Sequence, residues 1–234
     1  MIRFIFLNTF IVIFSIIICF ICIILSFFNK EDNIIHRRCV VPWAKIYLKV
    51  CGVKVEVKGA EYVNRDLPCI YMSNHQSYFD IFALLAGLPA DFKFLMKKEL
   101  MKIPMLGTAM RRVGYLSVDR GDTKNAIISM NAAAEKIRKG ASILVFPEGT
   151  RSKDGHVQAF KKGGFHMAFK AGCDIVPIAI LNSRDIVPKG SLRIKKGTIK
   201  INIGRPIPVK DYSGDMNKLI KRTREAVISQ MTDI

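Results

Sequence analysis

A histidine and an aspartate lie five positions apart in the stretch 74–80, Asn-His-Gln-Ser-Tyr-Phe-Asp. The stretch follows an apolar segment, 68–72, and precedes an apolar segment of helical character, 81–88. A strand followed by a helix places the Asp80 carboxylate on the first helical turn, from which it can reach back to the His75 imidazole. A carboxylate that holds one ring nitrogen leaves the other free to accept a proton. The spacing therefore indicates a general base and the group that orients it.

The same residues also fit a purely structural pattern. Ser77 and Asp80 match an S-x-x-D capping box, in which Ser77 would be the N-cap of the following helix. Judged alone, the spacing favours this cap over catalysis. The choice between the two interpretations depends on what the other loops of the chain carry.

Two further loops that follow predicted strands carry arginines. The predicted strand 113–118 is followed by Arg120, and the predicted strand 143–146 by Pro-Glu-Gly-Thr-Arg-Ser, in which the arginine is Arg151. Glycine lets a backbone approach a ligand closely, and the planar guanidinium group suits phosphate. Because the carboxyl ends of parallel strands share one edge of a sheet, both arginines should lie near His75. Together they predict a phosphate-binding pocket.

Several catalytic classes lack their usual motifs. The sequence has no G-x-S-x-G elbow, no P-loop and no G-x-G-x-x-G turn, which argues against a serine hydrolase, a nucleoside triphosphatase and a dinucleotide-dependent enzyme. His75, Asp80 and Glu148 are conceivable metal ligands, but no second histidine at helical spacing accompanies them. The six cysteines are scattered and predict no disulfide framework. We therefore expect neither a metal nor a cofactor.

Strand-length apolar runs alternate with helical stretches, which predicts an α/β fold with a largely parallel central sheet flanked by helices. The expected strands are 53–57, 68–72, 92–96, 113–118, 143–146, 175–181 and 198–203. The expected helices are 77–88, one that begins at Pro104, 122–138, 157–171 and 215–231. Unusual polar residues concentrate in three loops that follow strands, so we expect the site where these loops meet. The three loops are 73–80, 119–121 and 146–152.

Residues 4–28 contain no charged side chain and are typical of one apolar helix. A helix of these 25 residues extends about 37 Å, enough to cross a hydrocarbon core of about 30 Å. A cleaved signal peptide is the competing interpretation, but no small-x-small cleavage site follows the apolar run. We expect a retained membrane-anchoring helix, which either spans the bilayer or returns within one leaflet.

The segment 36–50 interleaves basic, apolar and aromatic residues and predicts a short amphipathic helix at the membrane interface. An ordinary core-packing helix with solvated lysines is the alternative. Basic residues next to an anchor favour a cytoplasmic location for the chain that follows. We therefore divide the chain into a membrane-anchoring segment, 1–50, and an α/β catalytic domain, 51–234.

The formal net charge is +18, and residues 1–30 contribute only Arg3 and Lys30 to it, which leaves +16 on the remainder. Such a basic body implies an acidic partner, for example an anionic lipid surface, a phosphorylated substrate or an acidic carrier protein. Nucleic acid has the least support. The sequence shows no zinc-ligand spacing, no aromatic RNP-like strand and no basic helix leading into a heptad zipper.

Four motifs in sequence order resemble those of a known family. The stretch 74–80 matches an N-H-x4-D box, and the stretches 114–120, 146–152 and 176–180 match the family's second, third and fourth motifs. Across 68–181, about half of the chain, the sequence resembles the glycerolipid acyltransferases, and among them the 1-acylglycerol-3-phosphate acyltransferases. Further positions that fit the family's usual pattern are Lys98, Pro104, Gly107, Lys161 and Gly163.

The resemblance implies acyl transfer to a lipid hydroxyl. His75 would take the proton from the 2-hydroxyl of a lysophosphatidic acid, and Asp80 would orient the imidazole. The oxygen would then attack the thioester of acyl-CoA or acyl carrier protein directly and form phosphatidic acid. Cationic side chains would bind the phosphate, while Glu148 and Gly149 would shape the glycerol pocket. The substrate-binding residues implied in this way are Lys98, Arg120, Glu148, Gly149, Thr150 and Arg151.

The resemblance implies no cofactor, and it names as partners the two substrates and membrane lipid. We expect the catalytic domain to face the cytoplasm, at a bacterial inner membrane. Other functions stay open at this point. They are acylation of glycerol-3-phosphate or another lysolipid, hydrolysis of the thioester by water, and non-catalytic binding to an anionic membrane.

Overall fold

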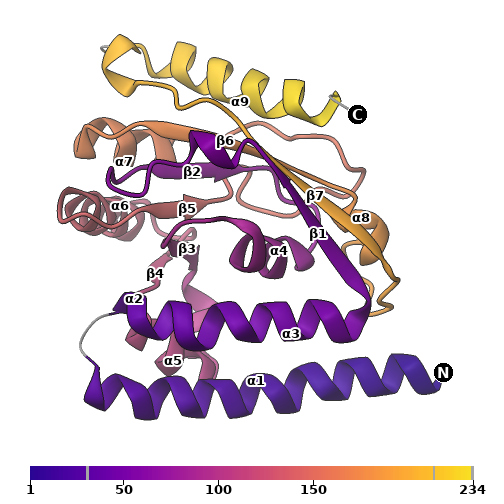
Figure 1. Cartoon of the computed structure of the whole chain (residues 1–234). Coiled ribbons are helices and arrows are strands. Elements are labelled where there is room, and N and C mark those ends of the chain that lie inside the picture. The colour runs from indigo at the N-terminus through magenta and orange to yellow at the C-terminus, as the bar shows by residue number, and fades with distance from the viewer. Residues whose placement is uncertain (30–31, 213, 233–234) are drawn as a thin grey trace.

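The computed structural model describes residues 1–29, 32–212 and 214–232. Its centre is a seven-stranded sheet in the order β1-β7-β6-β2-β5-β3-β4, with helices on both faces (Figure 1). The strands are β1 (Val53–Lys58), β2 (Ile70–Ser73), β3 (Lys93–Lys97), β4 (Leu116–Val118), β5 (Ile143–Val145), β6 (Ile175–Leu181) and β7 (Gly197–Ile203). The longer helices are α1 (Ile2–Phe28), α3 (Val41–Cys51), α4 (Phe79–Gly87), α5 (Leu106–Arg112), α6 (Thr123–Arg138), α7 (Gly163–Ala171) and α9 (Met216–Thr232). Shorter turns are α2 (Asp32–Ile35), a π-helical turn (His36–Val40) and α8 (Ser183–Ile186).

Strand directions confirm the expected α/β fold with a largely parallel sheet. From β6 through β2, β5 and β3 to β4, every neighbouring pair is parallel. β7 runs antiparallel to β6, and β1 runs parallel to β7. Every residue of β6 is buried, which explains why its sequence, Ile-Val-Pro-Ile-Ala-Ile-Leu, is apolar without alternation. The carboxyl ends of β2, β5 and β6 therefore meet at one edge, as the placement of the site requires.

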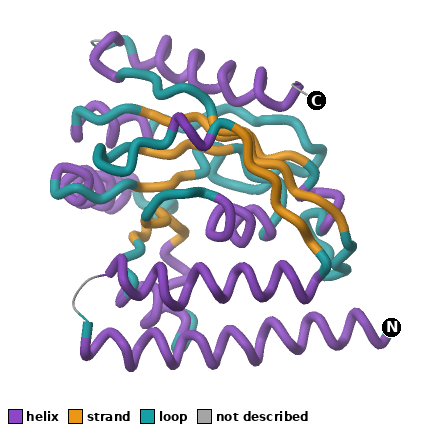
Figure 2. Tube along the Cα trace, viewed as in Figure 1, coloured by secondary structure: helices purple, strands orange, loops and turns teal. Residues whose placement is uncertain are grey.

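Apolar side chains form two layers, one on each face of the sheet. Tyr71 of β2 packs into the layer beneath α1, α3 and α4, whereas Ile70 and Met72 pack into the layer beneath α6, α7 and α9. Successive strand residues point to opposite faces, so one short strand contributes to both layers. Figure 2 shows the helices on either side of the strands.

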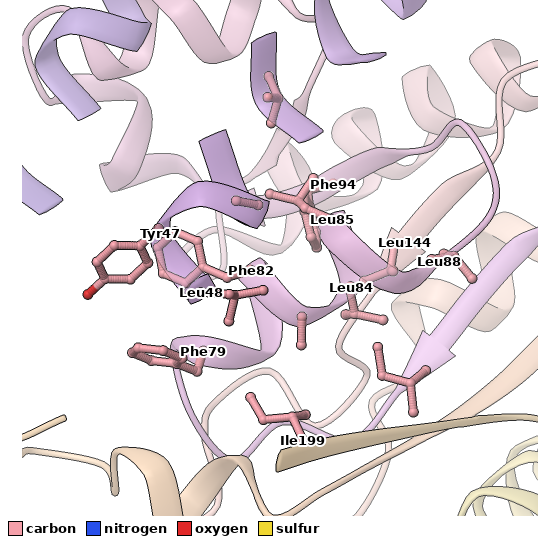
Figure 3. Close-up of a cluster of buried hydrophobic side chains, with 14 of the residues drawn as sticks. Tyr47, Leu48, Phe79, Phe82, Leu84, Leu85, Leu88, Phe94, Leu144 and Ile199 are labelled. Atoms are coloured by element: carbon pink, nitrogen blue, oxygen red, sulfur yellow. The ribbon is translucent and has the colours of Figure 1, made fainter. Parts of the chain in front are cut away.

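Aromatic rings fix α4, the helix that carries Asp80, against α3. The ring centroids of Tyr47 and Phe82 are 4.6 Å apart, and those of Tyr47 and Phe79 are 5.5 Å apart (Figure 3). All three rings are buried. Edge-on and tilted contacts of this kind stabilise beyond the area that they bury, so the start of α4 has a defined position.

α3 confirms an amphipathic helix over residues 41–50 of the expected 36–50, and residues 36–40 form a π-helical turn. Ala44 and Tyr47 are buried, whereas Lys45 and Lys49 are exposed. Because the apolar side faces α4 and the sheet, the core-packing interpretation accounts for that side of the helix.

α1 lies alongside α3 and runs in the opposite direction (Figures 1 and 2). Near its start, the Arg3 guanidinium donates to the backbone oxygens of Ile194 (2.6 Å) and Cys51 (3.0 Å). Near its end, the guanidinium carbon of Arg112 from α5 lies 5.0 Å from the centroid of the Phe27 ring. By length and composition α1 could cross a membrane. It is nevertheless attached to the domain at both of its ends.

The helix expected at 157–171 is wrong over its first six residues, since α7 begins at Gly163. The preceding backbone has partners elsewhere. The Gln158 N–H donates to the Glu148 carboxylate (2.9 Å), and the Arg224 guanidinium of α9 donates to two carbonyl oxygens of this segment (2.6 and 3.1 Å). Because distant side chains satisfy these groups, the segment does not need helical hydrogen bonds.

Candidate active site

The residue after β2 keeps the chain attached to the sheet. Asn74 is buried and exchanges two hydrogen bonds with Ile180 of β6. Its Nδ2 donates to the Ile180 carbonyl oxygen (2.8 Å), and its Oδ1 accepts from the Ile180 N–H (2.7 Å). The side chain thus extends the strand pairing by one step, and the loop to α4 leaves the sheet at the expected edge. Sequence reasoning assigned Asn74 no role, because its partner is distant in the chain.

The structure brings together the predicted pair. His75 Nδ1 lies 2.7 Å from Asp80 Oδ2. An ionised carboxylate only accepts hydrogen bonds, so Nδ1 carries the proton and Nε2 is left as the acceptor. Asp80 is fully buried and its Oδ2 also accepts from the N–H groups of Gln76 (2.7 Å) and Ser77 (2.9 Å). One oxygen therefore orients both the imidazole and the loop that carries it.

The capping interpretation holds in part. Asp80 binds the Ser77 N–H, as the acidic residue of a capping box does. The N-cap position is Tyr78, however, so the expectation for Ser77 is wrong by one residue. Ser77 Oγ accepts from the Phe79 N–H (3.2 Å) and donates to the Val187 carbonyl oxygen (2.7 Å). That hydroxyl is occupied by structural bonds.

The 146–152 loop is bonded to the backbone of His75 at two points. Glu148 Oε1 accepts from the His75 N–H (2.7 Å), and the Ser152 N–H donates to the His75 carbonyl oxygen (2.7 Å). The second oxygen of Glu148 accepts from the Gln158 N–H (2.9 Å). Burial raises the pKa of Glu148, and the bonds from Gln158 and His75 act in the opposite direction. Both oxygens thus face backbone amides.

A phenylalanine of the same loop supports the imidazole. The ring of Phe146 is stacked on that of His75, with centroids 3.9 Å apart and planes 15° apart. The His75 side chain is 16% exposed, so its ring is held between Phe146 and Asp80 with little freedom to rotate. The sequence placed Phe146 in a motif but gave no signal for this contact.

The structure brings Arg120 and Arg151 to the loop that is bonded to His75. Arg120 Nη1 donates to the carbonyl oxygen of Gly149. Burial raises the pKa of the Tyr78 phenol, and the positive charge of Arg151 acts in the opposite direction. The bond from the Ser152 N–H to the His75 carbonyl oxygen places Arg151, the preceding residue, beside the 74–80 stretch, as expected of residues at adjacent strand ends.

Two other predicted binding residues have partners within the chain. Lys98 Nζ lies 3.0 Å from Asp119 Oδ2. Thr150 Oγ1 accepts from Lys189 Nζ (3.2 Å), which also donates to the carbonyl oxygen of Arg151 (2.7 Å). Lys189 lies between α8 and β7, outside every motif, and sequence reasoning missed it. Through these two bonds it braces the 146–152 loop.

Among the described residues, no three His, Cys, Asp or Glu side chains gather in a way that could hold a metal ion. His75, Asp80 and Glu148 are close together, but Glu148 is committed to backbone amides.

Fold and site together define an α/β acyltransferase. A family model described as Acyltransferase matches residues 54–181 of this chain. The crystal structure of the 1-acyl-sn-glycerophosphate (LPA) acyltransferase PlsC from Thermotoga maritima is similar, with a TM-score of 0.78 and 30% identity. The similarity covers 97% of this chain and 90% of that one.

Curated relatives show which acyltransferases the chain is similar to. The 1-acyl-sn-glycerol-3-phosphate acyltransferase BAT2, chloroplastic, of Brassica napus is 35% identical over 206 residues, 87% of this chain and 58% of that protein. The 1-acyl-sn-glycerol-3-phosphate acyltransferase alpha of Homo sapiens is 30% identical over 208 residues, 88% of this chain and 72% of that protein. The chain spans little more than half the length of the plant relatives that it matches. It belongs to the family of 1-acyl-sn-glycerol-3-phosphate acyltransferases.

Proposed function

We propose that the protein transfers an acyl group from acyl-CoA or acyl carrier protein to the 2-hydroxyl of 1-acyl-glycerol-3-phosphate, forming phosphatidic acid for phospholipid synthesis. The observation that carries the proposal is the attachment of the His75 backbone, through Glu148 and Ser152, to the loop that bears Arg151. A base and a cationic loop fixed to each other suit an acceptor whose hydroxyl and phosphate stand on neighbouring carbons.

The proton and bond changes follow from the position of the imidazole. His75 Nε2 takes the proton of the 2-hydroxyl as that oxygen attacks the thioester carbonyl carbon, which forms the C–O bond and a tetrahedral oxyanion. Collapse of this intermediate breaks the C–S bond, and the leaving thiolate takes the proton back from the imidazolium. Asp80, 2.7 Å from Nδ1, stabilises the cationic ring between the two steps. The acyl group passes directly between substrates, without an acyl-enzyme.

The substrate phosphate is assigned to the cations around the 146–152 loop. Arg120 and Arg151 offer planar guanidinium forks, and Lys98 adds an ammonium group. Gly149 and Thr150 would line the glycerol pocket. Because both Glu148 oxygens accept from backbone amides, Glu148 would shape the pocket through the loop that it holds.

Replacing Lys189 with alanine should raise the KM for the acceptor by about three- to tenfold, because Thr150 and the Arg151 backbone each lose a hydrogen bond worth about 1 kcal/mol. The kcat should change less, since the His75–Asp80 pair is untouched. Steady-state kinetics with varied acceptor would measure both. Lys195→Ala, which removes an exposed lysine of the same segment, is the control. An unchanged KM in Lys189→Ala would show that the brace has no effect on binding.

The proposed activity is tested by incubating the purified full chain with donor and acceptor panels and identifying products by mass spectrometry. The donors are acyl-CoA and acyl carrier protein. The acceptors are lysophosphatidic acid, glycerol-3-phosphate and other lysolipids. We expect phosphatidic acid from lysophosphatidic acid. Release of free fatty acid regardless of acceptor would identify a thioesterase, and membrane binding without any transfer would identify a non-catalytic module.

We propose that residues 1–50 anchor the catalytic domain, 51–234, at the membrane and that α1 lies in the plane of one leaflet. A bilayer-spanning α1 would carry one of its ends across about 30 Å of hydrocarbon. The domain residues bonded to that end, such as Ile194 or Arg112, would have to follow it. In-plane placement leaves these contacts intact and presents the exposed Phe and Ile side chains of α1 to lipid. The flanking basic residues favour the cytoplasmic face.

An epitope tag fused before residue 1 should be digested together with the catalytic domain. The reason is that Arg3 is bonded to the domain, so both ends of α1 lie on one side of the bilayer. Sealed vesicles with the domain outside would be treated with protease, and both segments followed by immunoblot. A lumenal protein serves as the control for sealing. A tag that survives while the domain is digested would establish a spanning helix.

A further inference from the structure

A lysine from outside the 146–152 loop lies over the glycine of that loop. The Lys161 N–H donates to the Pro147 carbonyl oxygen (2.9 Å), which sets the two segments side by side. A Cβ built on Gly149 would lie 3.1 Å from Lys161 Cε and 3.2 Å from Lys161 Nζ. The Lys161 ammonium group therefore sits against the Gly149 backbone. Gly149 has a φ of +74°, so a side chain at this position would strain the backbone.

This ammonium group is not neutralised within the described part of the chain. Lys161 is exposed and forms no ion pair there. The neighbouring carboxylate, Glu148, is 3% exposed, and its oxygens accept from backbone amides. Arg120 also donates to the Gly149 carbonyl oxygen. Two cations from different loops thus meet at one glycine, and the carboxylate of the preceding residue, Glu148, is buried.

Gly149 is held at a fixed place relative to the base. It lies between Glu148 and Ser152, and both of these bind the backbone of His75 at 2.7 Å. In the proposed acceptor, the reacting 2-hydroxyl and the phosphate are carried by neighbouring glycerol carbons. A hydroxyl at His75 Nε2 therefore brings the phosphate to the neighbourhood of Gly149.

We propose that Lys161 is a further substrate-binding residue and that it binds the acceptor's phosphate together with Arg120 and Arg151. The inference rests on the proposed acyl transfer and adds a residue to it. A phosphate monoester carries a charge of about −1.5 to −2 at pH 7, more than one guanidinium group offsets. Lysine supplies a compact positive charge on a flexible stem, which can follow the phosphate as the acceptor settles against the loop.

The test measures acceptor kinetics of the full chain in mixed micelles. Lys161→Ala should raise the KM for lysophosphatidic acid about tenfold, the size expected for losing a hydrogen bond to a charged group, with kcat within about twofold. Lys161→Arg should stay within about threefold of the wild type, because it keeps the charge. The matched control is Lys162→Ala, which removes the adjacent exposed lysine, whose side chain has no hydrogen bond or ion pair with the described residues.

Two substrate changes separate the phosphate of the acceptor from those of the donor. With 1-acylglycerol, which keeps the hydroxyl and lacks the phosphate, wild type and Lys161→Ala should have equal kcat/KM. A loss that persists on this acceptor would overturn the assignment. So would a loss that disappears when acyl-CoA is replaced by an acyl N-acetylcysteamine thioester, since Lys161 would then bind the phosphates of the donor.

Calorimetry with glycerol-3-phosphate keeps the proposal testable if the proposed function fails. A wild type that acylates no lysophospholipid would refute the proposed function, but the phosphate site would remain measurable. We expect glycerol-3-phosphate to bind the wild type and Lys162→Ala equally and to bind Lys161→Ala about tenfold more weakly. Equal binding by all three proteins, or binding by none, would refute the role of Lys161.

Discussion

Replacing His75 with alanine should lower kcat by about 10³-fold or more, near the upper range for losing a general base. In the proposed reaction the imidazole takes the 2-hydroxyl proton, and Asp80 acts through the ring nitrogen to which it is bonded. Substrate binding should change little, because the backbone bonds from Glu148 and Ser152 to residue 75 do not involve the side chain. Initial rates at saturating acceptor and donor would measure the loss.

His166→Ala is the matched control, since His166 is exposed on α7 and lies outside the site. Thermal unfolding of both variants shows whether the fold is retained. Loss of the Phe146 stacking contact should cost His75→Ala about 1 kcal/mol of unfolding free energy. A folded His75→Ala protein with wild-type kcat would refute the mechanism, because the reaction would then not need the His75 imidazole as its base.

Asp80→Asn should lower kcat by about 10²-fold while costing less stability than Asp80→Ala. Asp80 Oδ1 has no hydrogen-bond partner among the described residues, so the amide nitrogen of asparagine can take its place without meeting another donor. The amide oxygen at the Oδ2 position can still accept from His75, Gln76 and Ser77. What disappears is the negative charge that stabilises the imidazolium, and the substitution therefore isolates that charge.

Asp80→Ala should reduce both rate and stability. It leaves the buried N–H groups of Gln76 and Ser77 without their acceptor, which should cost about 2 to 4 kcal/mol of unfolding free energy. Denaturant titration of the two Asp80 variants, measured beside their kcat values, separates the roles. Equal stability of Asp80→Ala and wild type would contradict the structural role, and full activity of Asp80→Asn would contradict the electrostatic one.

Local sequence was sufficient where both partners are near each other in the chain. His75 and Asp80 are separated by less than two helical turns, and the helix start that brings them together is encoded within the same seven residues. The apolar runs at 143–146 and 175–181 likewise predicted buried strands, because a central strand is apolar on both faces. The parallel edge then followed from the alternation of strands and helices.

Partners distant in the chain could not be predicted. The bonds of Asn74 to Ile180 and of Lys189 to the Arg151 carbonyl join segments brought together only by the tertiary fold. Glu148 is the clearest case. Its motif position indicated a pocket residue, but the sequence could not show that a backbone amide donates to each carboxylate oxygen. The reversed direction of β7 and β1 likewise depends on the long connection after β6.

The wrongly predicted start of the 157–171 helix also results from partners distant in the chain. The pattern of 157–162 is compatible with a helix, and only Glu148 and Arg224, far away in sequence, supply the alternative partners. Ser77 differs in that its error is local. The box places the N-cap at Ser77, whereas the helix starts one residue later, with Tyr78 as its N-cap.

The two backbone bonds between His75 and the 146–152 loop also bear on how such a protein can change over generations or in the laboratory. A substitution that shifts either loop moves the other. The 74–80 and 146–152 stretches should therefore change together, although about 70 residues separate them. A chimera that takes only one of these stretches from a relative would combine two loops that do not fit each other. Designers who wish to alter acceptor choice should exchange both stretches together, with residue 189 as their common brace.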